Sequence, residues 1–180
     1  MTILITGGAG YIGSQTSRLL TSLGREIVVL DSLERGNATS VLGAPLVIGD
    51  IADTALVTKI CLKHKVTTVV HFAAYKSAGE SMSQPEMYWR NNVQGTVNLV
   101  EGMLAANVQH IVFSSSAAVY GNPQSSPISE ASAISPANVY AETKATMERV
   151  IRWYGETHGL RWTSLRYFNA AGASSDGILG

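Results

Sequence analysis

The first thirteen residues constrain the fold of this chain more than any other stretch. Ile3–Ile5 is a short apolar run of the kind that is buried in a parallel sheet. It leads into Gly8-Ala-Gly10-Tyr-Ile-Gly13, which fits the pattern G-x-G-x-x-G, and Gly7 adds a second glycine register. Residues 14–23 follow with helical spacing of their leucines and no proline or glycine. This order predicts a sharp backbone turn whose helix start offers free N–H groups to a pyrophosphate.

An acidic residue follows where a dinucleotide site needs one. Asp31 closes a second apolar run, Ile27–Leu30, eighteen residues after Gly13. A carboxylate at this place accepts hydrogen bonds from the adenosine ribose hydroxyls and repels the extra phosphate of NADP. The alternative is that Asp31 is only a turn acid at a strand end. Together with the glycine turn, it predicts an NAD site.

Apolar runs alternate with helical patterns along the whole chain, which is typical of a parallel sheet built from βαβ units. The expected strands are 3–5, 27–30, 46–48, 67–72, 111–113 and 162–167, and the expected helices are 14–23, 53–62, 88–106 and 139–158. We therefore predict an α/β fold, a doubly wound parallel sheet (Rossmann fold) of about six strands with helices on both faces. Residues 1–172 would form this NAD-binding domain, and 173–180 an unstructured end. Residues 73–81 and 122–136 are expected to be loops beside the site.

The composition excludes several classes of partner. Thirteen Lys and Arg balance thirteen Asp and Glu, so nothing predicts a nucleic acid or an anionic membrane as partner. No apolar stretch reaches the roughly 18 residues that cross a bilayer. Cys61 is the single cysteine and is expected in the core, and the four histidines lack metal-ligand spacing, so no metal is predicted. We expect a cytoplasmic, enzyme-like domain.

Tyr140-Ala-Glu-Thr-Lys144 is the second informative motif. On a helix, residues i and i+4 share a face, so the phenol and the ammonium should point the same way. A free tyrosine has a pKa of about 10, and a lysine cation and a nicotinamide ring would favour the phenolate that a base needs. Lys144 would also hold the nicotinamide ribose. The alternative is a solvated helix face.

Polar side chains also mark two of the expected strands. Ser114–Ser116 stand at the end of the fifth expected strand, and one of these hydroxyls would hydrogen-bond a substrate oxygen beside the tyrosine. The sequence does not choose among the three serines. His71 lies inside the fourth expected strand, and we expect it to be a buried, hydrogen-bonded core residue.

These motifs resemble those of the extended short-chain dehydrogenase/reductase superfamily, and most closely its UDP-glucose 4-epimerase (UDP-galactose 4-epimerase) family. The matching stretches run through the whole chain in order: Thr6–Ser14, Gly49–Ile51, Val70–Ala73, Gly79–Ser81, Asn91–Val93, Ser114–Ser116, Val119–Gly121, Tyr140 with Lys144, and Leu165–Asn169. Sister dehydratases carry an Asp-Glu pair directly after the strand-five serine or threonine. This chain has Ala117-Ala118 there, which favours an epimerase.

The resemblance implies which residues surround NAD. Those implied to contact the pyrophosphate or shape its turn are Gly7, Gly8, Gly10, Tyr11, Ile12 and Gly13. Those implied around the adenosine are Asp31, Ser32, Gly36, Asn37, Asp50 and Ile51. Those implied along the rest of the cofactor are Phe72, Ala73, Lys76, Asn92, Ser114, Tyr140, Lys144 and Phe168.

The resemblance also implies a substrate and a mechanism. Tyr140 would be the base, Ser116 its partner at the sugar oxygen and Lys144 the ribose clamp, while Lys76 and Asn169 would contact a UDP-sugar. Tyr140 takes the proton of the C4 hydroxyl while hydride passes from C4 to NAD. The 4-keto sugar then turns over and takes the hydride back on its other face, which regenerates NAD.

Family members continue for nearly as long again, whereas this chain stops within a loop at 178–180. We therefore expect the N-terminal part only, without the second half of the substrate pocket. Three hypotheses stay open: an epimerase of UDP-glucose, an epimerase of another UDP-sugar such as UDP-glucuronate or a UDP-N-acetylhexosamine, and a catalytically silent NAD-binding module. Helices 88–106 and 139–158 are the candidate surface of a homodimer.

Overall fold

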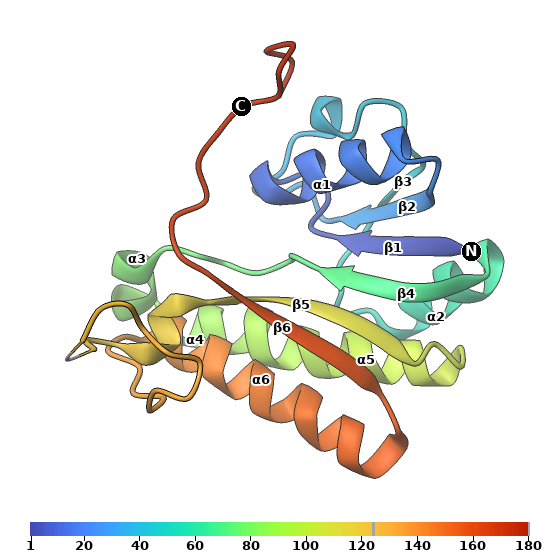
Figure 1. Cartoon of the computed structure of the whole chain (residues 1–180). Helices are drawn as coiled ribbons and strands as arrows, with labels where there is room; N and C mark the ends of the chain where they lie inside the picture. The colour runs from blue at the N-terminus through green and yellow to red at the C-terminus, as the bar shows by residue number, and fades with distance from the viewer. Residues whose placement is uncertain (124, 180) are drawn as a thin grey trace.

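The computed structural model describes residues 1–123 and 125–179. It contains one parallel six-stranded sheet with helices packed against it (Figure 1). The strands are β1 (Thr2–Thr6), β2 (Glu26–Asp31), β3 (Leu46–Ile48), β4 (Val66–His71), β5 (His110–Ser116) and β6 (Arg161–Tyr167). The helices are α1 (Tyr11–Ser22), α2 (Thr54–His64), α3 (Ala78–Ser83), α4 (Pro85–Tyr88), α5 (Gly95–Ala105) and α6 (Val139–His158). Two 3-10 turns, η1 (Ala38–Val41) and η3 (Ala117–Tyr120), and one π-helix, η2 (Trp89–Gln94), complete the described elements.

The strand order β3-β2-β1-β4-β5-β6 confirms the predicted doubly wound fold. The chain starts in the middle of the sheet, moves outward through β2 and β3, and returns to the other side of β1 with β4. Ile5 of β1 is in register with Val29 of β2 and with Val70 of β4. The order reverses between β1 and β4, and open α/β sheets bind ligands at such a reversal, beyond the carboxyl ends of the strands.

Successive residues of the central strands face two separate apolar layers. The layer beneath α2, α5 and α6 is the larger one and takes every second residue of β1 and β2, including Leu4, Val28 and Leu30. The intervening Ile5 and Val29 face the layer on the α1 side. Both faces of β2 are therefore covered, which is why its sequence is a continuous apolar run rather than an alternating one.

The structure corrects two of the expected elements. Residues 73–81 are not all loop, because α3 begins at Ala78 and the Ser77 hydroxyl accepts the Glu80 N–H at 3.3 Å, the cap geometry of a Ser-x-x-Glu sequence. Pro85 is the first-turn proline that its place before the expected helix 88–106 predicts, but this helical segment passes through the π-helix η2 before α5. The described parts of 122–136 and 173–180 contain no helix or strand; residues 124 and 180 lie outside the described residues.

The core contains one histidine, as expected. His71 is 1% exposed, and its ring nitrogens pair with the hydroxyls of Thr6 at 2.7 Å and Thr96 at 3.0 Å. Burial, assisted by the charge of Lys144, lowers the pKa of His71 to about 3. Cys61 is buried as expected, and burial raises its pKa to about 11.

Two negative observations apply to residues 1–123 and 125–179. None of their helices combines the length and the apolar character that a membrane crossing requires. No three side chains of His, Cys, Asp or Glu come together there as a set that could bind a metal ion.

The buried His71 predicts an acid-sensitive fold. Its unfolded pKa is about 6.5, so below that pH the unfolded chain takes up a proton that the folded chain excludes until about pH 3. As the pH decreases through this window, the free energy of unfolding should therefore decrease, by up to about 1.4 kcal/mol per pH unit from His71. Urea unfolding from pH 7 to 4 should show a steeper fall for the wild type than for His71→Gln. Equal slopes would contradict the assignment.

Candidate active site

A cavity of about 880 Å³ lies at the carboxyl ends of the strands, around the point where the strand order reverses. The turns that follow β1, β2, β4, β5 and β6 all contribute to its wall, and α6 adds Tyr140 and Lys144. This is the position at which an open parallel sheet binds its ligand.

Most of the residues that the sequence nominates line this one cavity. They are Gly7, Gly10, Tyr11, Ile12, Gly13, Asp31, Ser32, Gly36, Asp50, Ile51, Phe72, Ala73, Lys76, Ser114, Ser116, Tyr140, Lys144, Phe168 and Asn169. The structure places Gly8, Asn37 and Asn92 outside the lining. A Cβ on Gly8 would lie 2.7 Å from a methyl carbon of Val29, so Gly8 allows close packing against β2. Asn37 caps η1, and Asn92 is fully buried.

The glycine turn brings the start of α1 to the cavity. Gly7 has a φ of 71°, in the left-handed region that glycine tolerates, and its N–H donates to the Leu30 carbonyl at 2.9 Å. A Cβ on Gly13 would overlap the carbonyl oxygen of Gly7, so α1 packs against the turn only with glycine there. Gly10 caps α1 without any side-chain hydrogen bond. The first N–H groups of the helix thus remain available to an anion, as a pyrophosphate requires.

Asp31 is fixed by the same turn. Its Oδ2 accepts the Ala9 N–H at 2.9 Å, and its Oδ1 accepts the Leu33 N–H at 2.9 Å. A carboxylate has about four acceptor positions, so these two bonds leave capacity for hydroxyl groups in the cavity. The side chain is only 8% exposed in total, and it lines the wall beside Gly36. The carboxylate is thus held in place with acceptor positions free for the hydroxyl groups of a ribose.

The first turns of α6 place Tyr140 and Lys144. Asn138 caps the helix by accepting the Ala141 N–H at 2.9 Å, and the Tyr140 N–H donates to Ser81 Oγ at 3.0 Å. Lys144 Nζ lies 6.0 Å from the centre of the Tyr140 ring, which confirms that the two side chains share a face. The same Nζ donates to the carbonyl of Ser114 at 2.7 Å, at the end of β5.

Burial governs the protonation of both groups. It lowers the pKa of Lys144 to about 7, against the opposing charge of Glu148. Burial also raises the pKa of Tyr140, and hydrogen bonding with Ser116 offsets only part of that rise. For the protein alone, the pKa of Tyr140 is therefore raised. The expectation that the Lys144 cation and a nicotinamide ring together favour the phenolate stays a prediction.

A charged network behind the site was missed at the sequence level. Arg166 on β6 donates to Glu148 on α6 at 2.9 and 2.7 Å and to the Tyr120 hydroxyl at 2.5 Å. Ser115 donates to the same carboxylate at 2.5 Å. The network joins β5, β6, η3 and α6. The bonded pairs are 18 to 46 residues apart in the chain, so no spacing in the sequence indicates them.

Residues 3–178 match the model of the NAD dependent epimerase/dehydratase family. The chain belongs to this family. Its membership confirms the resemblance that the ordered motifs predict.

The chain is also similar to individual members of the family. It is 48% identical over 181 residues to a UDP-glucose 4-epimerase of Lactobacillus helveticus, an alignment that covers 100% of this chain and 55% of that protein. A crystal structure of UDP-glucose 4-epimerase from Brucella ovis in complex with NAD superposes with a TM-score of 0.98 at 43% identity, covering 99% of this chain and 55% of that one. The structure of the UDP-Glc/GlcNAc 4-epimerase from Campylobacter jejuni superposes with a TM-score of 0.89 at 38% identity. That superposition covers 97% of this chain and 55% of the other. The chain thus spans about half the length of these relatives.

Two glycines of the family's turn should respond differently to alanine. Gly13→Ala would force a Cβ into the Gly7 carbonyl oxygen, so we expect a loss of roughly 2 kcal/mol or more in the free energy of unfolding. A Cβ on Gly10 would meet nothing nearer than 3.3 Å, so Gly10→Ala should cost about 1 kcal/mol or less as a lost cap. Urea unfolding of both variants measures the difference. Similar losses would mean that the turn does not depend on close packing at Gly13.

Proposed function

We propose that this chain forms the NAD-binding half of a UDP-glucose 4-epimerase, an enzyme that interconverts UDP-glucose and UDP-galactose. One observation carries the proposal: a single cavity is lined by the start of α1, which has no capping side chain, by Asp31, and by Ser116, Tyr140 and Lys144. Membership of an epimerase/dehydratase family supports the reaction class.

The cavity wall fits a dinucleotide along its length. The α1 start and its glycine turn would take the pyrophosphate, and Asp31 with Ser32 and Gly36 would take the adenosine ribose. Asp50 and Ile51 would flank the adenine, since they follow β3 at the same edge of the sheet. Phe72, Ala73 and Lys76 would continue the wall toward Ser114 and Lys144.

When bound, NAD supplies a reversible acceptor for the hydride on C4 of the sugar. In the proposed mechanism Tyr140 removes the proton of the C4 hydroxyl, with Ser116 holding the same oxygen. Because burial raises the pKa of the phenol, Tyr140 would lose its proton readily only beside a positive charge. Tyr140 is thus a base that acts only in the loaded site. Lys144 would hold the nicotinamide ribose from its place beside Ser114.

The wall beside Ser116 supports epimerisation over dehydration within this family. Elimination of water needs an acid and a base next to the strand-five serine. Ala117 and Ala118 line the cavity there, and neither can transfer a proton. The proposed site therefore has Tyr140 as its proton-transferring group.

A second candidate substrate is a UDP-N-acetylhexosamine. The similar protein from Campylobacter jejuni is named for both UDP-Glc and GlcNAc, so the fold alone does not distinguish a C2 hydroxyl from an acetamide. On this chain, Phe168 and Asn169 would begin the nucleotide-sugar site, since they follow β6 and line the cavity.

We also propose that α5 and α6 pair with a second copy of the chain. The two helices pack side by side and share a groove lined by Val97, Val150, Trp153 and Tyr154. Trp153 is 60% exposed there, a large apolar side chain that a homodimer would cover.

The first test is the nucleotide released when the purified chain is denatured. We expect about one NAD per chain. We also expect a full-length protein that contains this chain to convert UDP-galactose. Tyr140→Phe should keep the NAD and lose activity by roughly 10²–10⁴-fold, because the general base is removed while the cavity shape is retained. A Tyr140→Phe variant as active as the wild type would exclude Tyr140 as the base.

Asp31 should set the preference for NAD over NADP. Asp31→Asn removes the charge that repels a ribose phosphate and loses a charge-assisted acceptor, so we expect NADH to bind about tenfold more weakly. NADPH should bind the variant better than it binds the wild type. Fluorescence titration with both nucleotides measures the two affinities, and an unchanged ratio would place the adenosine elsewhere.

A further inference from the structure

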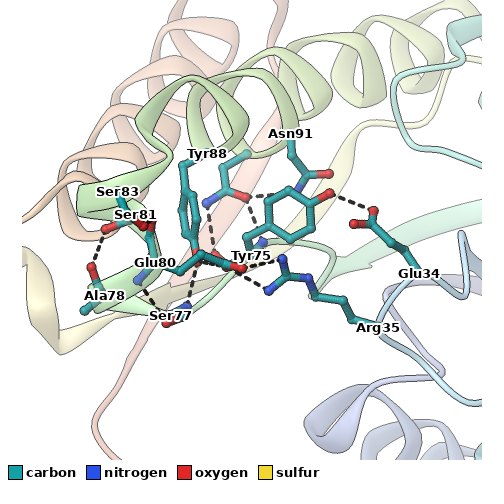
Figure 2. A network of polar contacts seen from close by, with 11 residues as sticks. Glu34, Arg35, Tyr75, Ser77, Ala78, Glu80, Ser81, Ser83, Tyr88 and Asn91 are labelled. Atoms are coloured by element: carbon teal, nitrogen blue, oxygen red, sulfur yellow. Dashed lines mark hydrogen bonds and ion pairs between the residues drawn. The ribbon is translucent and has the colours of Figure 1, made fainter.

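Two loops face each other across the exit of β1. One follows β2 and carries Glu34 and Arg35; the other follows β4 and carries Tyr75, leading into α3 with Glu80. β1 lies between β2 and β4 in the sheet, so its glycine turn emerges between the two loops. Figure 2 shows Arg35 reaching from the first loop toward Tyr75 and Glu80 of the second.

The contacts between the loops are well oriented. Arg35 Nη1 and Nη2 donate to the two carboxylate oxygens of Glu80 at 2.8 and 2.9 Å. The guanidinium carbon lies 4.3 Å from the centre of the Tyr75 ring, and the Tyr75 hydroxyl donates to Glu34 Oε2 at 2.6 Å. A planar guanidinium group that binds both oxygens of a carboxylate and stacks on an aromatic ring is held in one orientation.

The far side of this bridge is fixed. Tyr88 is fully buried and donates from its hydroxyl to Glu80 Oε2 at 2.6 Å, while the Ser77 N–H donates to the same hydroxyl at 3.0 Å. Arg35, and next Tyr88, hold the pKa of Glu80 below its usual range, so its carboxylate is charged at neutral pH. Glu80 is thus an anchor that is already in place when Arg35 binds it.

Tyr75 is held in the same way. The side chain of Asn92, inside η2, accepts the Tyr75 N–H at 2.8 Å and donates to the Tyr75 carbonyl at 3.1 Å. Neither the Arg35 loop (32–37) nor the Tyr75 segment (72–77) contains a helix or strand. The bridge therefore joins two loops through the side chains of Glu34, Arg35, Tyr75 and Glu80.

We propose that Glu34, Arg35, Tyr75 and Glu80 form a clasp over the dinucleotide cavity, which must open for NAD to enter or leave. Glu34, Arg35 and Tyr75 line the same cavity as the glycine turn, whereas Glu80 does not, so Arg35 spans the cavity to an anchor beyond its wall. The inference rests on the proposed NAD site. A slow gate suits the proposed reaction, because each turnover regenerates NAD and no exchange is needed.

The test measures both rate constants of NADH with the intact chain. NADH binding is followed by stopped-flow fluorescence, and its release is followed by a chase with excess NAD. Glu80→Gln breaks the ion pair from outside the cavity and keeps an acceptor for Tyr88. We expect both the association and the dissociation rate constant to rise by roughly three- to tenfold, with little change in their ratio. Adding Arg35→Ala to this variant should raise the rates little further, because one bridge is broken in both.

A matched control is Glu26→Gln. It removes the ion pair between Glu26 and the amino group of Met1, 3.3 Å apart, at the opposite end of the strands, and should leave both rates unchanged. Arg35→Lys keeps the positive charge but removes the two-pronged guanidinium donor, so it should give intermediate rate constants. It replaces Glu80→Gln in the test if that variant is unstable.

The outcomes separate the clasp from the proposed function. A faster release with unchanged association would mean a direct contact with the nucleotide rather than a gate, and unchanged rates in both variants would remove the clasp altogether. A wild-type chain that binds no NADH would overturn the proposed NAD site, and the clasp with it.

Discussion

The close packing of α1 against the turn after β1 is the constraint on which the rest of the site depends. It requires a residue without a side chain at Gly13, next to the Gly7 carbonyl, and again at Gly7, where a Cβ would lie 2.6 Å from the Ala73 nitrogen. These two contacts fix the exits of β1 and β4 against each other and aim the start of α1 into the cavity. Asp31 is then oriented by the backbone of the same turn through Ala9. The sheet order, the glycine turn and the orientation of the proposed ribose acceptor thus depend on one another.

Burial of ionisable groups gives this site its chemical character. His71 remains neutral at any pH near 7, Lys144 titrates close to neutrality, and the phenol of Tyr140 holds its proton more firmly than in water. All three effects have the same first cause, the loss of solvent around a charge. In the proposed mechanism the missing charge arrives with the cofactor, so the base becomes effective only where hydride can be accepted.

Much of the fold was predictable because local patterns and tertiary burial agree. β2 is buried on both faces and reads as an unbroken apolar run. Asp31 and Tyr140 line one cavity, as the glycine turn, the acid at a strand end and the Tyr-x-x-x-Lys motif predict when taken together. The start of α3 was missed although Ser77 and Glu80 form a local capping pattern, because small residues around them favoured a loop. The π-helix η2 was not predictable, since Asn92 within it bonds to Tyr75, seventeen residues earlier. Arg35 and Glu80 are forty-five residues apart, and no periodicity connects them.

The carboxylate of Glu148 has a wider consequence than its place behind the site suggests. It binds Arg166 of β6 from α6, the helix that carries Tyr140 and Lys144. Phe168 and Asn169 follow β6 directly and line the cavity, at the end proposed for the sugar. The segment proposed to meet the substrate and the helix that carries the proposed base are therefore joined by one ion pair. Sequence changes around the sugar would be transmitted through Arg166 to the position of the phenol, so substrate choice and proton transfer are expected to evolve together.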